Sequence, residues 1–500
     1  MSAEPSSPET ADIGVSPSVW RYAHASRAHL IIDGAAYFVH MRAAMVQARQ
    51  RILLIGWDFD TRILVGEGRR WWNLPRRKVA PARLGAFIMW LANRRPGLDV
   101  RLLKWNFGAM KALLRGTMVW DLLRWALHPR ITYRLDSAHP LGCSHHQKIV
   151  VIDDKVAMCG GIDMTAERWD TREHREKDQR RRLPGGLRTF GPWHDSSLML
   201  EGEAARALGD LGRQRWAQAG GKPLAPCLPQ TESAWPNRVA AEFTDVEVGI
   251  ARTRSAWRDI SAVREVEALA VEQIGRAQRF IYAENQYFAS RRIAEALAER
   301  LAEPDPPEVV VVMPLASHGW LQHTAMDNAR ARLFAAVKAV DHADRLSIWI
   351  PRNAAGTPIY VHAKLTIIDD EILRVGSANW NNRSMGLDTE CDVFIDAQRP
   401  ANAGCEAQIR AIRHSLLGEH CDLAADLVGS ELDRHRSMAA MIAAQPANGR
   451  HLERYVPPEL SEAAKVLADS ALLDPEAPEE MLAFYRHRGL FRSRILKRPA

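Results

Sequence analysis

The chain has 500 residues, which is longer than a single hydrophobic core usually extends, so two domains are expected. Hydrophobic residues make up 47% and charged residues 25% of the chain, which excludes a disordered protein and is typical of a globular one. The net charge of +7 favours anionic partners such as phospholipid headgroups or nucleic acid. It does not choose between them, and a basic surface kept for solubility would give the same charge.

The first 17 residues are rich in Ser, Pro and Glu, which predicts a disordered leader, and they lack the apolar core of a secretory signal. No stretch reaches the roughly 18 apolar residues of a membrane span, so a lipid substrate would be reached from the aqueous side. The six cysteines are scattered without a CxxC pair, which argues against a disulfide framework and a structural zinc site. These features together predict a cytoplasmic protein, peripheral to the membrane if its substrate is a lipid.

Patterns typical of helices and strands alternate from residue 18 onward. A helix is expected over 35–49 and strands over 51–57 and 99–105, which predicts a first α/β lobe over 18–216. Gly, Pro and polar residues over 217–240 predict a linker. Strands expected over 280–283, 308–313 and 345–350 belong to a second lobe over 241–430. Strand patterns then stop, and 431–500 is expected to form a helical, basic tail.

One segment occurs twice. HQKIVVIDDKVAMCGGID begins at His146, and HAKLTIIDDEILRVGSAN begins at His362. The copies align without a gap, and each passes from His-x-Lys through an apolar strand, an Asp-Asp turn and a second strand to Gly-[Gly/Ser]-x-[Asp/Asn]. A looser alignment of the following strands places Asp195 over Glu390. A single His-x-Lys would be unremarkable, but two complete copies are hard to explain by structure alone.

These residue types suit phosphodiester chemistry. His and Lys two positions apart on a strand face the same side, so two copies would present two imidazoles and two ammoniums to one pocket. The lysines would neutralise the phosphate charge, one neutral His would attack phosphorus, and the other His would protonate the leaving group. Ser377 and Asn379 are candidates to bind phosphate oxygens. Asp195 and Glu390 are candidates to fix the imidazole tautomers. No metal or other cofactor is expected.

The duplicated segment resembles the HKD motif of the phospholipase D superfamily. The resemblance covers roughly residues 20–430, and SHHQK, GPWHD, AENQYF and GSANWNNRSM are similar to the eukaryotic-like phospholipases D. It implies two similar lobes, each a mixed sheet flanked by helices, related by a pseudo-twofold axis with one active site between them. A monomer would therefore suffice.

The resemblance also implies residue roles. The catalytic set would comprise His146, Lys148 and Asp153 with His362, Lys364 and Asp369, the two aspartates being more structural than chemical. The His of the first copy would be the nucleophile. Asp163, Ser377 and Asn379 would bind the substrate phosphate, and Asp163 departs from the Asn of the second copy.

The activity implied first is hydrolysis of glycerophospholipids at a membrane surface, or transfer of the phosphatidyl group to an alcohol, since both reactions share one covalent phosphohistidine intermediate. A phosphatidyltransferase such as cardiolipin synthase is the alternative. A nuclease of the same superfamily is a third hypothesis, which the +7 charge permits and the subfamily features disfavour, so no nucleic-acid partner is expected.

Overall fold

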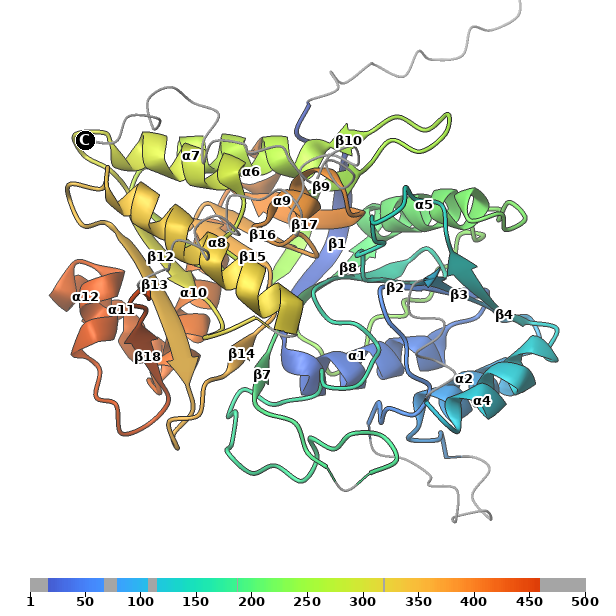
Figure 1. Cartoon of the computed structure of the whole chain (residues 1–500). Coiled ribbons are helices and arrows are strands. Elements are labelled where there is room, and N and C mark those ends of the chain that lie inside the picture. Colours follow the sequence, from blue (N-terminus) through green and yellow to red (C-terminus); the bar gives the residue numbers. More distant parts are fainter. Residues whose placement is uncertain (1–16, 67–78, 107–114, 187, 318–319, 459–500) are drawn as a thin grey trace, which may run out of the picture.

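The computed structural model describes residues 17–66, 79–106, 115–186, 188–317 and 320–458 (Figure 1). The expected leader, except residue 17, and the expected basic tail beyond 458 lie outside the described residues.

The first half of the chain contains eight strands and four helices among its described residues. The strands are β1 (Arg21–Ile32), β2 (Arg51–Gly56), β3 (Asp99–Trp105), β4 (Ile131–Asp136), β5 (Ile149–Ile152), β6 (Val156–Gly160), β7 (Trp193–His194) and β8 (Ser196–Gly202). The helices are α1 (Asp33–Gln47), α2 (Leu84–Arg94), α4 (Met118–Ala126) and α5 (Glu203–Gln218). The three elements expected from sequence in this half are present within about two residues of the predicted bounds.

The second half begins with β9 (Phe243–Arg254), and no helix or strand lies between α5 and β9 in the described chain. The further strands are β10 (Val263–Arg264), β11 (Phe280–Glu284), β12 (Glu308–Val312), β13 (Leu346–Arg352), β14 (Tyr360–Val361), β15 (Leu365–Ile368), β16 (Ile372–Gly376), β17 (Glu390–Asp396) and β18 (His451–Arg454). The helices are α6 (Glu265–Arg276), α7 (Arg291–Leu301), α8 (Trp320–Lys338), α9 (Asn382–Gly386), α10 (Glu406–His420), α11 (Ala425–His435) and α12 (Met438–Ala444), with a 3₁₀ turn at Pro400–Asn402.

The two halves repeat one sheet topology. The halves meet at β1 and β9. From these strands outward, the order in the first half is β1-β8-β6-β5-β2-β3-β4. In the second half it is β9-β17-β16-β15-β11-β12-β13, with β18 added at the edge. In both halves the outer three strands of this series are parallel and the inner ones antiparallel. The expected α/β fold of two similar lobes is therefore confirmed.

The two expected sheets are joined into one. β1 pairs with β9 in antiparallel fashion from Arg21↔Ile250 to Ala28↔Phe243, which makes a single 16-stranded sheet. Figure 1 shows these two strands side by side where the halves meet. The largest buried apolar cluster draws residues from both halves, including Leu198 and Val393. The halves therefore share a core as well as a sheet.

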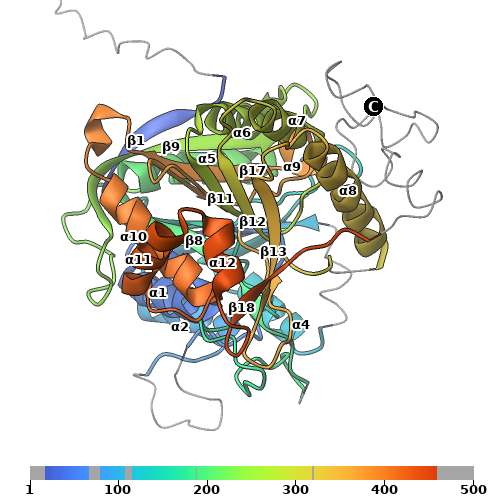
Figure 2. The same cartoon turned by 90° about the vertical axis from the view of Figure 1, so that its left-hand side faces the viewer.

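Helices cover both faces of the sheet. In the second half, α6, α7 and α8 pack on one face, and α10, α11 and α12 contribute to the shared cluster on the other (Figures 1 and 2). In the first half, α1, α2 and α4 pack opposite α5. No helix in the described chain is long and apolar enough to cross a membrane.

The region after residue 430 differs from expectation. It contains the end of α11 and the whole of α12, but His451–Arg454 forms β18 rather than helix. This strand pairs with β13 from Trp349↔Arg454 to Arg352↔His451. Four polar-rich residues carry little strand pattern of their own, so the open edge of β13 determines their conformation.

Candidate active site

Each copy of the repeated segment forms a tight hairpin. β5 pairs with β6, and β15 pairs with β16, across an Asp-Asp turn. Asp153 and Asp154 have φ of 54° and 53°, and Asp369 and Asp370 have 57° and 59°. Two consecutive left-handed residues make a type I′ turn, which Asp tolerates better than most residues.

The motif aspartates stabilise these turns rather than the chemistry. The Asp153 carboxylate accepts the backbone N–H groups of Arg49, Gln50 and Arg51, each at 2.7 Å. Asp369 likewise accepts three N–H groups from residues 278–280 at 2.6–2.8 Å. Both aspartates follow their strands, whereas the histidines precede them. They lie at the opposite strand end and bind backbone, as a structural role requires, and their membership of the catalytic set stays a prediction.

The two motif histidines are each paired with a carboxylate of the other half. His146 Nδ1 lies 3.0 and 3.1 Å from the two Glu390 oxygens. His362 Nδ1 lies 2.7 Å from Asp195 Oδ2. Both carboxylates are fully buried. A carboxylate on Nδ1 fixes the tautomer that carries hydrogen there and leaves Nε2 as the reactive nitrogen.

Backbone hydrogen bonds between the halves bring each histidine to the carboxylate of the other half. The His146 N–H donates to Thr389 O at 3.0 Å, immediately before Glu390. The His362 N–H donates to His194 O at 2.7 Å, immediately before Asp195. β14 and β7 form a two-stranded parallel sheet at the second contact, and an isolated His145↔Thr389 bridge forms the first. The same arrangement thus occurs twice, as the pseudo-twofold relation requires.

Glycines allow the close approach of strands at the site. A Cβ on Gly161 would lie 2.1 Å from Asp195 Oδ1 and 3.1 Å from His362 O. A Cβ on Gly376 would lie 1.8 Å from Asp392 Oδ1. A Cβ cannot lie 1.8 or 2.1 Å from an oxygen, so both positions require glycine. Gly161 allows His362 of the other half to approach, and Gly376 allows β17 to pack closely on β16.

The two lysines are buried beside the histidines. Lys148 Nζ donates to His146 O at 2.7 Å and lies 3.2 Å from Asp163 Oδ2. Lys364 Nζ donates to His362 O and to Gln286 Oε1, the latter at 3.2 Å. Burial, together with the Lys148 charge, lowers the pKa of Lys364 to about 7. An anion bound here would restore the charged form of Lys364, because it supplies the missing counter-charge.

Burial changes the proton affinity of the histidines and their carboxylates in opposite directions. Burial and the two lysine ammoniums lower the pKa of His146 well below its usual value, and the same causes with Arg168 lower that of His362. Burial raises the pKa of Asp195 to about 7 and that of Glu390 to about 8. The His146 imidazole is therefore expected to be neutral near neutral pH.

The three expected phosphate ligands have different environments. Asp163 faces Lys148 and accepts the Trp57 N–H at 3.0 Å, so it orients the lysine. The Ser377 hydroxyl donates to Glu390 and accepts the Cys391 N–H, so it supports Glu390, and its phosphate-binding role stays a prediction. Asn379 Oδ1 is buried without a hydrogen-bond partner in the described part of the chain. A phosphate oxygen could bind Asn379 only through its Nδ2 group, because Oδ1 is an acceptor, so the role of Asn379 as a phosphate ligand stays a prediction.

Arg168 is a further site residue that motif reasoning did not assign. Its guanidinium lies 4.3 Å from the Trp193 ring centroid, and its charge acts on His362, Lys364 and Asp195. Only 9% of Arg168 is exposed, and Trp193 lies 5.1 Å from the His362 ring. Its position in the RWD triplet after the first motif was the available sequence signal, but no spacing rule predicts that it folds back onto the second His.

The chain is similar in sequence to known phospholipases D. A family model described as "Phospholipase D" matches residues 290–468. The chain is 25% identical to phospholipase D alpha 2 of Oryza sativa subsp. japonica and 24% identical to phospholipase D alpha 1 of Carica papaya. Each match covers 77% of this chain and 63% of the relative, so the chain spans less than two thirds of the length of these relatives.

A solved structure has the same overall fold. The phosphatidylserine synthase of Haemophilus influenzae Rd KW20 matches 84% of this chain and 95% of its own, with a TM-score of 0.54. The sequences are only 13% identical, so this likeness concerns the fold alone.

Proposed function

Because the chain belongs to the phospholipase D superfamily, we propose that it cleaves the headgroup phosphodiester of glycerophospholipids. Transfer of the phosphatidyl group to water gives phosphatidic acid, and transfer to an alcohol gives a phosphatidyl-alcohol. The observation that carries the proposal is the crossed pairing of His146 with Glu390 and of His362 with Asp195. It supplies two imidazoles with Nε2 available, beside two buried lysines.

In the first step, His146 Nε2 attacks phosphorus and a P–N bond forms. The bond from phosphorus to the headgroup oxygen breaks, and that oxygen takes a proton from His362 Nε2. The negative charge of the bound phosphodiester opposes the effect of the lysines and so favours protonated His362. Lys148, Lys364 and Arg168 stabilise the charge on the phosphoryl oxygens.

In the second step, neutral His362 removes a proton from water or from an alcohol. The resulting nucleophile attacks phosphorus, and the P–N bond to His146 breaks. Asp195 and Glu390 stabilise each imidazolium as it forms, because each accepts the Nδ1 hydrogen. The choice between hydrolysis and transfer depends on which acceptor reaches His362.

A lipid substrate requires contact with a membrane surface, and α4 is the candidate element. Trp125 faces the core with 1% exposure, whereas Trp120 and Leu123 are 66% and 51% exposed, and Leu127, the residue directly after the helix, is 87% exposed. Exposed Arg124 lies among them. An amphipathic helix that presents Trp, Leu and Arg to solvent suits the interface of an anionic bilayer. We therefore propose that this helix makes the peripheral membrane contact.

The test is incubation of the full-length protein with vesicles of phosphatidylcholine, phosphatidylethanolamine and phosphatidylglycerol plus a primary alcohol, followed by mass spectrometry. We expect phosphatidic acid and phosphatidyl-alcohol, both absent with His146→Ala and unchanged with exposed His24→Ala. Cardiolipin formed from phosphatidylglycerol alone would identify the phosphatidyltransferase alternative. Unchanged lipids together with cleavage of DNA or RNA would overturn the lipid proposal.

A further inference from the structure

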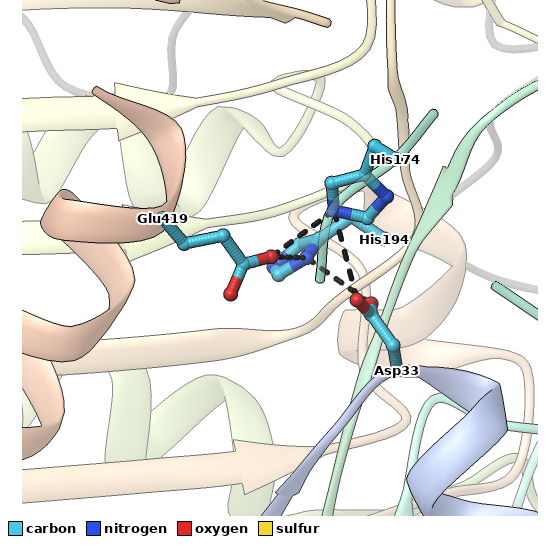
Figure 3. Close-up of side chains that lie close together, drawn as sticks. All are labelled: Asp33, His174, His194 and Glu419. Carbon is cyan, nitrogen blue, oxygen red and sulfur yellow. Dashed lines mark hydrogen bonds and ion pairs between the residues drawn. The ribbon is translucent and has the colours of Figure 1, made fainter. Parts of the chain in front are cut away.

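A second cluster of titratable side chains lies next to the active site and takes no part in the reaction above. Asp33, His174, His194 and Glu419 are all buried, with exposed fractions of 0–2% for their side chains. They come from the start of α1, the loop after the first motif, β7 and the end of α10 (Figure 3). One potential ligand atom from each lies within 4.8 Å of the others.

The spacing of these atoms is that of ligands around one ion. Glu419 Oε1 lies 3.0 Å from His174 Nε2 and 3.1 Å from His194 Nδ1. Asp33 Oδ1 lies 3.2 Å from His194 Nδ1, and Asp33 Oδ2 lies 3.6 Å from His174 Nε2. Four ligands at about 2.0–2.1 Å from a tetrahedral zinc ion are separated by roughly 3.3–3.4 Å.

The outer hydrogen bonds are those that metal-binding histidines usually make. His174 Nδ1 lies 3.0 Å from Asp170 Oδ2, which leaves Nε2 facing the cluster. His194 Nε2 lies 2.8 Å from Glu284 Oε2, which leaves Nδ1 facing the cluster. The other oxygen of Glu419 accepts from Arg172. A carboxylate on the far nitrogen fixes the tautomer and increases the basicity of the ligating nitrogen.

Two buried atoms in the cluster form no well-aligned hydrogen bond with any described residue, although carboxylate oxygens lie 3.1 and 3.2 Å from one of them and an imidazole nitrogen lies 3.6 Å from the other. They are Asp33 Oδ2 and His194 Nδ1, on side chains that are 1% and 0% exposed. Both face the other members of the cluster (Figure 3). Buried polar atoms that lack a well-aligned hydrogen bond are rare, and an ion at the centre of the cluster would satisfy both.

We propose that Asp33, His174, His194 and Glu419 bind one divalent transition-metal ion, with Zn²⁺ the best match. Two imidazoles disfavour Ca²⁺ and Mg²⁺, which prefer oxygen ligands alone. The two carboxylates would balance the charge of the dication. All four ligand positions are filled by protein, as in a structural rather than a catalytic zinc site.

The ion would act by positioning Asp195. The Asp195 N–H donates to Asp33 Oδ1 at 3.1 Å, and the Asp33 N–H donates to Asp195 O at 2.8 Å. His194 O accepts the His362 N–H. Glu419 comes from the second half and the other three ligands from the first, so the ion would also join the halves beside this pair. The proposal does not depend on the substrate of the active site.

The first experiment measures the metal content of the full-length protein purified without chelator, and the binding of Zn²⁺ after removal of metal. We expect about one ion per chain and a cobalt derivative with the visible spectrum of a tetrahedral site. Asp33→Asn and Glu419→Gln remove a ligand with little change of shape, and Asn retains the tolerance of Asp for the φ of 66° at position 33. Both should abolish stoichiometric binding. Asp170→Asn should weaken it by about 10- to 100-fold.

The matched control is Asp426→Asn, which removes an exposed carboxylate on α11 and should leave binding unchanged. Circular dichroism of each variant establishes that it is folded. The proposal is overturned if the folded wild-type protein contains no metal and shows no saturable Zn²⁺ binding. It is equally overturned if Asp33→Asn and Glu419→Gln bind Zn²⁺ as the wild type does. Neither outcome bears on lipid cleavage, which is measured separately.

Discussion

At the scale of single residues, the unusual feature is that each reactive imidazole is oriented by a carboxylate of the other half. For Glu390→Gln we expect kcat to fall by about 10²- to 10⁴-fold, because an amide can neither select the Nδ1–H tautomer nor stabilise imidazolium at His146. Steady-state kinetics on vesicles provides the measurement, with exposed Glu299→Gln as the control. A loss confined to KM would contradict this role.

The same substitution should alter the pH dependence of stability. The pKa of Glu390 is raised by burial to about 8, so the folded state retains a proton that the unfolded state loses near its ordinary value of 4.5. Its contribution to the free energy of unfolding therefore falls as pH rises from about 4.5 to about 8. We expect Glu390→Gln to gain stability relative to wild type across that window, as measured by urea denaturation at its two ends. A constant difference between the proteins would contradict the raised pKa.

Sequence reasoning succeeded for residues within one motif and failed for residues assembled by the fold. His146 and His362 are identified by a repeated local pattern. Arg168 and the buried Asp33–His174–His194–Glu419 cluster have no local signature, because their partners lie up to 386 positions apart, between 33 and 419. The expectation of no metal rested on local spacing, and the ion proposed for this cluster departs from it.

At the scale of elements, the Asp-Asp turns are predicted to affect stability without affecting catalysis. Asp153→Asn replaces a charged acceptor of three N–H groups while tolerating the same φ. We expect a loss of about 1.5–3 kcal/mol in the free energy of unfolding with kcat nearly unchanged. Chemical denaturation and activity at saturating substrate check this, and Asp369→Asn should behave alike. A large loss of kcat in the folded variant would contradict a purely structural role.

The exposed face of α4 gives a prediction about vesicle binding. Replacing Trp120 and Leu127 by Ser removes apolar surface from the proposed interface without touching buried Trp125. We expect weaker sedimentation with anionic vesicles and a higher apparent KM, while activity on a short-chain, monomeric lipid is unchanged. Leu228→Ser, at a residue that is 74% exposed elsewhere, is the matched control. Equal vesicle binding by the variant and the wild type would exclude α4.

Strands with strong apolar patterns were predictable from sequence, whereas junction and edge strands were not. β3 matches its expected range, and β11 and β12 differ from theirs by one residue. β1, β9 and β18 had no assigned range, since their pairing partners are distant in the chain. Both long junction strands also mix polar with apolar residues, because parts of them are exposed. Their conformation depends on tertiary pairing more than on local propensity.

At the scale of the whole molecule, the shared sheet and core predict that the halves unfold together. We expect one calorimetric transition whose van't Hoff and calorimetric enthalpies agree. Val248→Ala, at a fully buried β9 position paired with Ala23 of β1, should destabilise the whole protein by about 2 kcal/mol. The measurement follows secondary structure and tryptophan fluorescence in parallel. Two resolved transitions, with only one shifted by Val248→Ala, would contradict a single cooperative unit.

The β1–β9 junction also has a consequence for synthesis on the ribosome. β1 finds its first partner when β8 emerges, but its other edge stays open until β9, which begins at Phe243. About 40 residues separate β8 from β9, which corresponds to a delay of roughly 2–8 s at 5–20 residues per second. During that interval the nascent chain exposes a 12-residue strand edge to other polypeptides. The yield of folded protein in cells should therefore depend on how fast the segment between β8 and β9 is synthesised and on whether chaperones are available during that time.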